Sequence, residues 1–237
     1  LREDVYRAII QGKPVVDFEK IYEDLFDRVA LSSLDRGYPL RDNSRSFYDP
    51  FKRVFDIIFS LIAGIISLSL YPFIILAIKL DDGGAAFIIQ ERVGQGGKEI
   101  KIIKFRSMKS SDRGVWVKKG DERITRVGKV LRKTRLDEIP QLYNVLKGDI
   151  SLIGPRPDIC GIKENLEKEI PYYNIRTIVK PGLSGWAQVN QERPPQSVEE
   201  TKERLMYDLY YIKHRSILLD AKIALRTLGI LASGTGL

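Results

Sequence analysis

The sequence predicts a helix-dominated α/β domain that associates with a membrane through a re-entrant hydrophobic segment, a helix followed by a break and a second helix. Three observations support this fold class: an uncharged apolar run with a proline inside it, two strand-like segments around a glycine-rich turn, and two amphipathic helical patterns near the C-terminus. A chain of 237 residues is long enough to bury one large core or two small ones.

Residues 1–50 are interpreted as the end of an upstream module followed by a linker, and residues 51–237 as the main domain. Apolar side chains recur at helical spacing over about 18–28, whereas residues 35–50 are polar and contain glycine and prolines, which is typical of a connector. The first residue is leucine and no signal-peptide pattern follows it, so the sequence is expected to begin inside a longer protein.

An uncharged apolar run of about 20 residues follows, which is long enough to enter a membrane. Pro72 lies inside the run, where it removes a backbone hydrogen bond and breaks a helix. Basic residues, which favour the cytoplasmic side, flank both ends of the run: Lys52, Arg53 and Lys79. These features favour a re-entrant segment over about 54–80 above a full span, and a buried helix of a soluble protein is the third alternative.

Two segments, 86–90 and 99–105, are rich in strand-forming residues and flank the turn sequence Gly94-Gln95-Gly96-Gly97, which predicts a short β-hairpin. The region 91–135 carries 15 basic and 5 acidic residues, so the positive net charge of the chain, +8, is concentrated there. A positive field of this kind is expected to attract an acidic lipid surface, a phosphorylated substrate or nucleic acid.

Helices are predicted over 198–215 and 217–231. The second is mostly apolar, with Lys222 and Arg226 four residues apart and therefore on one face. This pattern favours interfacial amphipathic helices that lie along a membrane surface, and the alternative is an ordinary amphipathic helix on a soluble core.

The residue inventory excludes several kinds of site. A single cysteine excludes an intrachain disulfide and a cysteine-based zinc site, and a single histidine excludes multi-histidine metal centres. Chemistry is therefore expected from carboxylates, basic side chains, tyrosines and hydroxyl groups.

The first of three motifs suited to that chemistry contains Asp137 and Glu138. They follow a basic stretch and precede Pro140, which suits the first turn of a helix. The positive end of a helix keeps nearby carboxylates ionised, ready to bind a metal ion or to attack phosphorus. The alternative is that the pair only caps the helix and pairs with neighbouring basic residues.

The second motif is Gly154-Pro155-Arg156-Pro157. Two prolines stiffen the backbone that carries Arg156, and a rigid guanidinium suits bidentate binding of a phosphate, although a purely structural turn is the alternative. The third motif contains Pro181-Gly182, which predicts a type II turn, and the side chains of Trp186 and Gln188, which suit a base or a sugar. For Trp186 the alternative is packing in the core.

Taken in order, these motifs resemble the bacterial sugar transferase family, the monotopic polyprenyl-phosphate phosphoglycosyl transferases. The resemblance covers about residues 51–237 and rests on the stretches 104–108, 136–144, 147–157 and 181–189. It implies transfer of a sugar phosphate from a UDP-sugar to undecaprenyl (polyprenyl) phosphate with release of UMP, the first step of exopolysaccharide assembly. It also implies Mg²⁺ as cofactor and a catalytic domain on the cytoplasmic face of the bacterial inner membrane.

The resemblance also implies roles for individual residues. Asp137 matches the family's nucleophile, which forms a covalent phosphosugar intermediate, and Glu138 matches its metal-associated partner. The residues expected to bind phosphate and nucleotide are Lys104, Arg132, Pro155, Arg156, Pro157 and Gln188. The expected metal ligands are Glu138 and Asp137.

This chain departs from the family pattern in two places. The family's re-entrant helix breaks at a Ser-Pro pair, where this chain has Tyr71-Pro72, and Asn190-Gln191 stands where Asn-Gly is expected. A tyrosine does not make the short hydroxyl-to-backbone bond that a serine makes at a helix break.

Two other functions are weighed: a non-catalytic basic module on a membrane or on nucleic acid, and a polytopic glycan-lipid transferase. The first explains the charge but not the three motifs, and the single long apolar run argues against the second. The expected partners are a UDP-sugar, polyprenyl phosphate and anionic lipids of the inner membrane, with no nucleic acid. The identity of the sugar and the oligomeric state, a homo-oligomer included, are left open.

Overall fold

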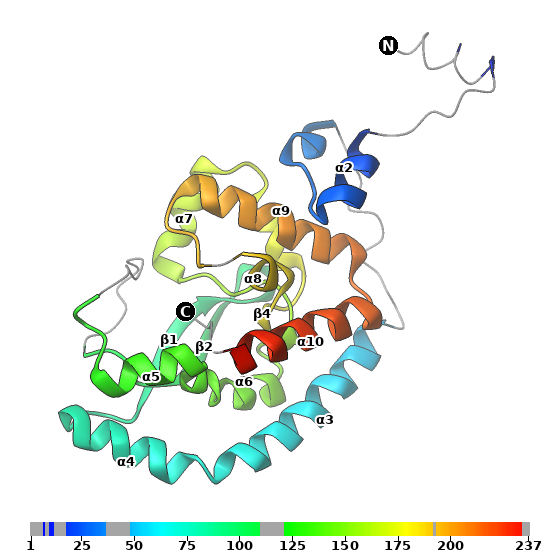
Figure 1. Ribbon diagram of the computed structural model, residues 1–237. Coiled ribbons are helices and arrows are strands. Elements are labelled where there is room, and N and C mark those ends of the chain that lie inside the picture. Colours follow the sequence, from blue (N-terminus) through cyan, green and yellow to red (C-terminus); the bar gives the residue numbers. More distant parts are fainter. Residues whose placement is uncertain are drawn as a thin grey trace.

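The computed structural model describes residues 7, 10–11, 18–36, 48–109, 121–191 and 193–233 (Figure 1). Its helices are α2 (Phe18–Phe26), α3 (Tyr48–Leu68), α4 (Tyr71–Asp82), α5 (Arg126–Thr134), α6 (Gln141–Lys147), α7 (Cys160–Glu169), α8 (Trp186–Asn190), α9 (Val198–His214) and α10 (Ile217–Ser233). Short 3-10 turns are η1 (Leu31–Arg36), η2 (Gln95–Gly97), η3 (Leu136–Glu138) and η4 (Tyr173–Ile178). Most of the expected linker and the middle of the basic region lie outside the described residues.

Two small sheets complete the fold. The expected hairpin is confirmed: β1 (Phe87–Val93) pairs antiparallel with β2 (Glu99–Phe105), with Phe87 opposite Phe105. A second sheet, which the sequence pattern does not predict, pairs β3 (Ser151–Ile153) in parallel with β4 (Gly182–Ser184). The helix-dominated fold class is confirmed, because the described residues form mostly helices and the strands make up two small sheets.

The apolar run forms α3 and α4, which meet at a bend of 59°. Pro72 lies in the first turn of α4, so the predicted break is confirmed. Two serine hydroxyls satisfy carbonyls before the bend: Ser67 Oγ donates to Gly64 O at 2.8 Å and Ser69 Oγ to Ile66 O at 3.0 Å. These serines therefore make the hydroxyl-to-backbone bonds that the tyrosine before the proline does not make.

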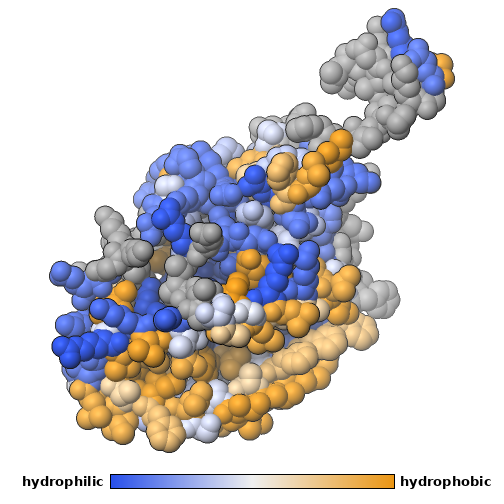
Figure 2. All heavy atoms as spheres, viewed as in Figure 1, coloured by the Kyte–Doolittle hydropathy of each residue, from blue (hydrophilic) through white to orange (hydrophobic). Residues whose placement is uncertain are grey.

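The burial of α3 is the reverse of an ordinary surface helix. Its buried residues are polar, namely Asp56, Ser60 and Ser67. Large apolar side chains of α3 and α4 are exposed instead, including Phe55, Ile58, Ile62, Ile65, Phe73 and Leu80. Figure 2 shows these apolar residues gathered along the lower edge of the molecule, over α3 and α4. Among the described helices none is long and apolar enough alone to cross a membrane, whereas this bent pair passes that test together.

Both outer ends of the bent pair are bonded to the rest of the domain. Arg53 of α3 donates two hydrogen bonds of 2.6 Å to carbonyls in the last turn of α6, and Asp56 accepts one of 3.1 Å from a backbone N–H of β3. At the other end, Asp81 of α4 accepts a hydrogen bond of 2.9 Å from a backbone N–H in the first turn of α5. Lys52 pairs with Asp220 of α10 at 2.7 Å. Two of the basic residues that flank the apolar run therefore bind the domain itself.

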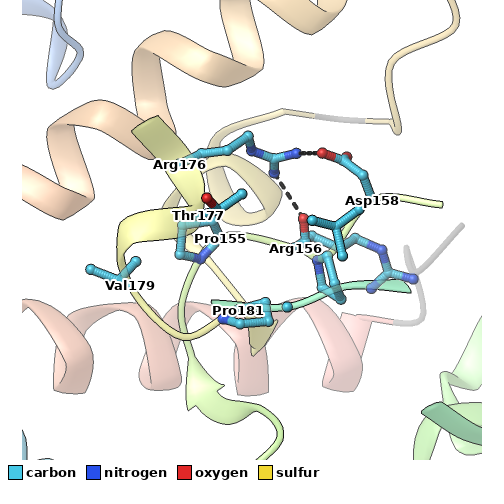
Figure 3. A pocket seen from close by; sticks show the side chains of 10 residues that line it. Pro155, Arg156, Asp158, Arg176, Thr177, Val179 and Pro181 are labelled. Atoms are coloured by element: carbon cyan, nitrogen blue, oxygen red, sulfur yellow. Dashed lines mark hydrogen bonds and ion pairs between the residues drawn. The ribbon is translucent and has the colours of Figure 1, made fainter. Parts of the chain in front are cut away.

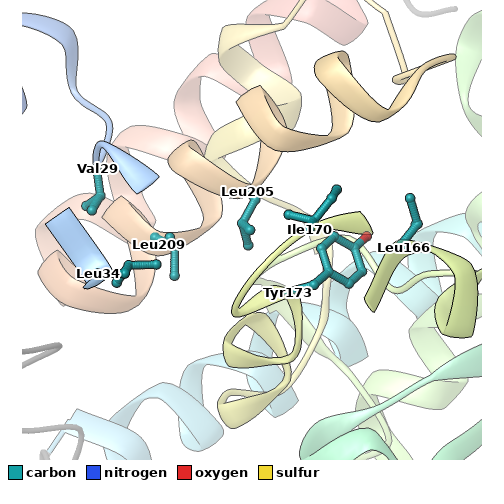
Figure 4. Close-up of a cluster of buried hydrophobic side chains, with 7 residues drawn as sticks. All are labelled: Val29, Leu34, Leu166, Ile170, Tyr173, Leu205 and Leu209. Carbon is teal, nitrogen blue, oxygen red and sulfur yellow. The ribbon is translucent and has the colours of Figure 1, made fainter. Parts of the chain in front are cut away.

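One of the main core clusters lies around α9 and includes the N-terminal segment (Figure 4). Val29 and Leu34 pack with Leu205 and Leu209 of α9, and the Val29 N–H donates to a carbonyl of α9 at 3.0 Å. Residues 18–36, part of the segment interpreted as the end of an upstream module, are therefore packed on the main domain, because their apolar face is buried against α9. The same packing makes α9 a core helix, which corrects its interpretation as interfacial.

Helix α10 is apolar on its outer side, where Leu218, Leu225 and Leu228 are exposed. Its two basic residues lie over the Trp186 ring, with Lys222 Nζ 4.8 Å and Arg226 Cζ 4.9 Å from the ring centroid. Lys222 and Arg226 thus share a face as predicted, and both stay exposed while their cationic groups lie beside the Trp186 ring.

The second and third sequence motifs meet in the β3–β4 sheet. The Gly154 N–H donates to Ser184 O at 2.8 Å, and the Gly182 N–H donates to Pro155 O at 2.9 Å. A Cβ on Gly182 would overlap the backbone of Gly154, so only glycine allows this close approach. Gly182 is the first residue of β4 and does not have the positive φ of a type II turn, so the turn predicted at Pro181-Gly182 is wrong.

Candidate active site

Two carboxylates lie on a 3-10 turn between α5 and α6. The chain reverses at Arg135, whose φ of 55° ends α5, and η3 then carries Asp137 and Glu138. Pro140, which was expected in the first turn of a helix, is instead the N-cap of α6, and the carboxylates precede that helix on η3. Both residues are 8% exposed. The turn therefore presents two acidic side chains in a largely buried setting.

Glu138 is held by two cations that come from other motifs. Its Oε1 accepts hydrogen bonds from Lys104 Nζ of β2 at 2.9 Å and from Arg156 Nη2 at 2.6 Å, and Arg156 Nη1 lies 3.4 Å from Oε2. Burial alone would raise the pKa of Glu138, but the charges of Arg156 and Lys104 outweigh it and hold this pKa well below its usual range. The structure thus brings three of the sequence-predicted site residues into direct contact.

Asp137 has a different environment. Within the described residues its carboxylate has no hydrogen-bond partner, and its pKa is raised to about 6, first by burial and then by the negative charge of Glu138. Lys104, Arg132 and Arg156 act in the opposite direction, lowering this pKa. The two neighbouring carboxylates therefore differ: one is paired and fully ionised, and the other is unpaired and titrates close to neutral pH.

A buried network holds the backbone of Arg156. Its carbonyl oxygen accepts hydrogen bonds from Arg176 Nη2 at 2.8 Å and from Arg204 Nη2 at 2.5 Å. Arg176 pairs in turn with Asp158 and with Asp208, and the part of this network around Arg156 is drawn in Figure 3. The two prolines restrict the backbone on either side of Arg156, and the network restrains its carbonyl, so its guanidinium starts from a fixed position.

Arg156 lines two small hollows. One lies between the Pro155–Asp158 stretch and η4 and is lined by both prolines of the motif (Figure 3). The other is lined by Arg92, Ile102, Lys104, Gln141, Arg156 and Pro157. Both prolines of the motif therefore border a hollow, and Pro157 borders both.

The remaining sequence-predicted site residues, Arg132 and Gln188, make their hydrogen bonds to groups other than the two carboxylates. Arg132 Nη1 lies 3.4 Å from Met108 Sδ, and its charge lowers the pKa of Asp137 without a hydrogen bond between the two side chains. Gln188 donates to the Leu183 carbonyl of β4 at 3.3 Å, a contact that does not bring it to the carboxylates. Trp186 is 1% exposed, stacks on Tyr210 and donates to the Asp27 carbonyl at 2.8 Å. Its interpretation as a base-stacking residue is therefore wrong, and the core alternative holds.

The same stretches lie in the part of the chain that matches a known protein family. The model of the bacterial sugar transferase family matches residues 47–234, which is most of the chain and includes every site residue named above. The chain belongs to that family.

Individual relatives of this bacterial sugar transferase are similar along much of its length. A UDP-N-acetylgalactosamine-undecaprenyl-phosphate N-acetylgalactosaminephosphotransferase of Aeromonas hydrophila is 40% identical over 237 residues, covering 97% of this chain and 55% of the relative. A UDP-glucose:undecaprenyl-phosphate glucose-1-phosphate transferase of Xanthomonas campestris pv. campestris is 38% identical, covering 89% and 47%. A protein of the same name from Caulobacter vibrioides is 39% identical, covering 86% and 77%. The chain thus spans about half the length of the first two relatives.

The family's Asn-Gly position is occupied here without strain. Gln191 has φ −108° and ψ 134°, an extended backbone that any residue adopts. Asn190 donates from Nδ2 to the Trp186 carbonyl at 2.7 Å and accepts from Arg226 at 2.9 Å. The loop of this bacterial sugar transferase therefore does not need a glycine after Asn190.

Sequence reasoning missed four residues that the structure brings to the site. Asn144 of α6 donates to the Lys101 carbonyl at 2.7 Å and accepts from the Ile103 N–H at 3.1 Å, which ties α6 to β2. Arg92 and Gln141 line the second hollow, and Arg135 has its pKa lowered by burial and by Arg156. A signal existed for Gln141 and Asn144, which lie three residues apart and therefore on one face of a short helix, directly after the carboxylates. No local signal marked Arg92.

Proposed function

We propose that this chain transfers a sugar phosphate from a UDP-sugar to undecaprenyl phosphate and releases UMP. The observation that carries the proposal is the pair of unlike carboxylates on η3, with Asp137 unpaired among the described residues beside Glu138, which is clamped by Lys104 and Arg156. The names of the relatives, which describe sugar-phosphate transfer to undecaprenyl phosphate, support the same reaction over a non-catalytic basic module.

The chemistry divides into two displacements at one phosphorus atom. An Asp137 carboxylate oxygen attacks the phosphorus that bears the sugar, the bond to the bridging oxygen breaks, and UMP leaves with the electron pair. An oxygen of undecaprenyl phosphate then attacks the same phosphorus, the bond to Asp137 breaks, and the carboxylate is restored. Such a covalent step lets a soluble nucleotide and a lipid use one site in turn. Arg156 and Lys104 supply positive charge for the transferring phosphoryl group.

Magnesium is part of the proposal, with Asp137 and Glu138 as its ligands. Within the described residues no group of three or more acidic, histidine or cysteine side chains gathers. Mg²⁺ in nucleotide sites commonly binds one or two carboxylates, with substrate phosphates and waters completing its six ligands. The Asp137 carboxylate, which has no hydrogen-bond partner in the described part of the chain, and Glu138 Oε2 with its long 3.4 Å contact fit that donor set. When bound, the ion would neutralise charge on the diphosphate.

The same proposal places the domain at the cytoplasmic face of the bacterial inner membrane, with α3 and α4 in the lipid as a re-entrant pair. The exposed apolar surface of the pair and the polar side chains on its buried side support lipid as its surroundings. Bonds from both outer ends of the pair to the same domain support a return to the same face.

We expect peptide tags inserted before residue 51 and after residue 82 to lie on one side of the membrane. The physical reason is that the bend lets the pair enter and leave without crossing. Protease accessibility of each tag in sealed inside-out and right-side-out vesicles measures this. Tags cleaved from opposite faces contradict the re-entrant arrangement.

The reaction is tested with the full chain in membrane vesicles or detergent and a panel of UDP-sugars. UMP release that needs undecaprenyl phosphate for turnover, stops with EDTA and returns with Mg²⁺ is the expected result. Nucleic-acid binding that weakens steeply with salt, with no UMP release from any UDP-sugar, would instead favour the basic binding module.

The pKa of Asp137 predicts a pH dependence. The carboxylate attacks only when ionised, and with a pKa of about 6 its ionised fraction falls about tenfold per pH unit below that value. We expect the rate of a UMP burst, measured without lipid acceptor, to be steady above pH 7 and to fall as the pH is lowered through 6 toward 5. Omitting the acceptor removes titration of the lipid phosphate from the result. A flat profile between pH 5 and 8, with the fold intact by circular dichroism, contradicts the prediction.

A further inference from the structure

The hollow lined by Lys104, Gln141 and Arg156, here called the cationic hollow, has features that the clamp on Glu138 does not explain. Three segments distant in sequence line it: the hairpin through Arg92, Ile102 and Lys104, the start of α6 through Gln141, and the Arg156-Pro157 stretch. The strand register pairs Arg92 with Ile100 and Lys104 with Ile88, so Arg92 and Lys104 are on one face of the hairpin. The lining thus has three basic side chains and no carboxylate.

Gln141 is the second observation. It is 4% exposed, and its Nε2 atom has no hydrogen-bond partner within the described residues although it lines the cationic hollow. A buried amide donor without an acceptor costs folding free energy, so its retention points to a ligand that supplies the acceptor. The donor and the basic side chains together suit an anion with several acceptor oxygens, which is the chemistry of a phosphate.

The charges around the cationic hollow point in the same direction. Lys104, Arg156 and Arg92 line the same hollow, so their positive charges repel one another there. Glu138 is a single carboxylate shared by Lys104 and Arg156. An additional anion in the hollow would offset the repulsion among the three cations.

We propose that the cationic hollow is a phosphate subsite, with Arg92 and Gln141 among its binding residues, and that it holds the phosphate of departing UMP and the phosphate of arriving polyprenyl phosphate in turn. The inference rests on the proposed function. In both displacements the group that leaves or attacks lies in line with, and opposite to, the Asp137 oxygen. The P–O bond to UMP breaks and the P–O bond to the lipid phosphate forms in that same place, so one subsite serves both phosphates.

The main test replaces Arg92 in the full chain. Arg92→Gln is expected to raise the inhibition constant of UMP and the KM for undecaprenyl phosphate together, each by about 10- to 100-fold, because a charge-assisted hydrogen bond to each phosphate is lost. Arg92→Lys, which keeps the charge, is expected to recover a large part of both. Arg126→Gln is the matched control, since Arg126 is exposed at the start of α5, and both constants should stay unchanged.

Gln141→Leu separates binding from structure. Because the amide nitrogen has no partner in the described fold, its removal should leave the thermal midpoint equal or higher, while UMP inhibition weakens by about three- to tenfold. A lower midpoint together with weaker inhibition would assign Gln141 a structural role and overturn its part in the subsite.

Three results bear on the subsite as a whole. Unchanged UMP and lipid constants in Arg92→Gln overturn it. Weaker UMP inhibition with an unchanged KM for undecaprenyl phosphate overturns the shared use, because only the nucleotide phosphate then occupies the hollow. A wrong assignment of the proposed function gives a different result, because the unmodified chain would then release no UMP from any UDP-sugar. If only the subsite assignment is wrong, the unmodified chain still releases UMP.

Discussion

Asp137→Asn is expected to abolish UMP release, by at least about 10⁴-fold, while membrane association and the fold are retained. The amide is nearly the same size as the carboxylate and loses no hydrogen bond within the described structure, so the fold has little reason to change. The variant lacks the anionic oxygen that forms the bond to phosphorus, and removal of a nucleophile costs orders of magnitude in kcat. UMP release and the mass of the protein after incubation with UDP-sugar alone measure the two consequences.

Asp24→Asn is the matched control, because Asp24 is an exposed residue of α2 away from the carboxylate turn. The control should turn over normally and acquire the mass of a sugar phosphate when the lipid acceptor is omitted. Asp137→Asn should acquire none. Normal UMP release by Asp137→Asn, or an adduct on that variant, would remove Asp137 as the nucleophile.

Arg156→Lys is expected to lower kcat/KM for the UDP-sugar by about ten- to a hundredfold. Arg156 binds Glu138 through both terminal guanidinium nitrogens, and its backbone is restrained by two prolines and by Arg176 and Arg204. A lysine keeps the charge but replaces the planar fork by a single ammonium group, so a two-point contact is not remade. Charge-assisted hydrogen bonds contribute about 1.5–3 kcal/mol, which corresponds to this range.

Arg126→Lys is the comparison for this substitution, since that exposed arginine has no contact with the carboxylates. Its kcat/KM should match that of the unmodified chain, with circular dichroism confirming both folds. Equal behaviour of the two variants would mean that the Pro-Arg-Pro stretch acts only as a structural turn.

The elements that sequence reasoning predicted well are those that depend on local chemistry. The proline inside the apolar run breaks the helix wherever the run lies, because its ring and missing N–H act within one turn. The hairpin follows from strand-forming residues on both sides of a glycine turn, and its register from 87 to 105 needs no other part of the chain. The carboxylate pair was predicted as a unit, although its helix begins later than expected.

The errors share a different cause. Trp186, Pro181-Gly182 and the N-terminal segment were each given an interpretation that suits an exposed or independent segment. In the structure each of them packs against a partner that is distant in sequence. Tyr210 and α10 cover Trp186, and the backbone of Gly154 lies directly against Gly182 of β4. Helix α9 covers Val29 and Leu34. The intrinsic preferences of a short segment do not indicate which distant residues will pack against it.

By itself, the sequence determined the family, the break in the apolar run, the hairpin and which motifs contain the chemistry, because prolines, glycines and hydrophobic spacing act over a few residues. Only the tertiary structure decided which cations meet Glu138, since Lys104 and Arg156 lie 34 and 18 positions away from it. It also decided which side of α3 is polar and buried, and that Asp137 has no hydrogen-bond partner among the described residues while its neighbour is clamped. These properties depend on distances and burial between remote segments, and burial and charge proximity are what shift a carboxyl pKa.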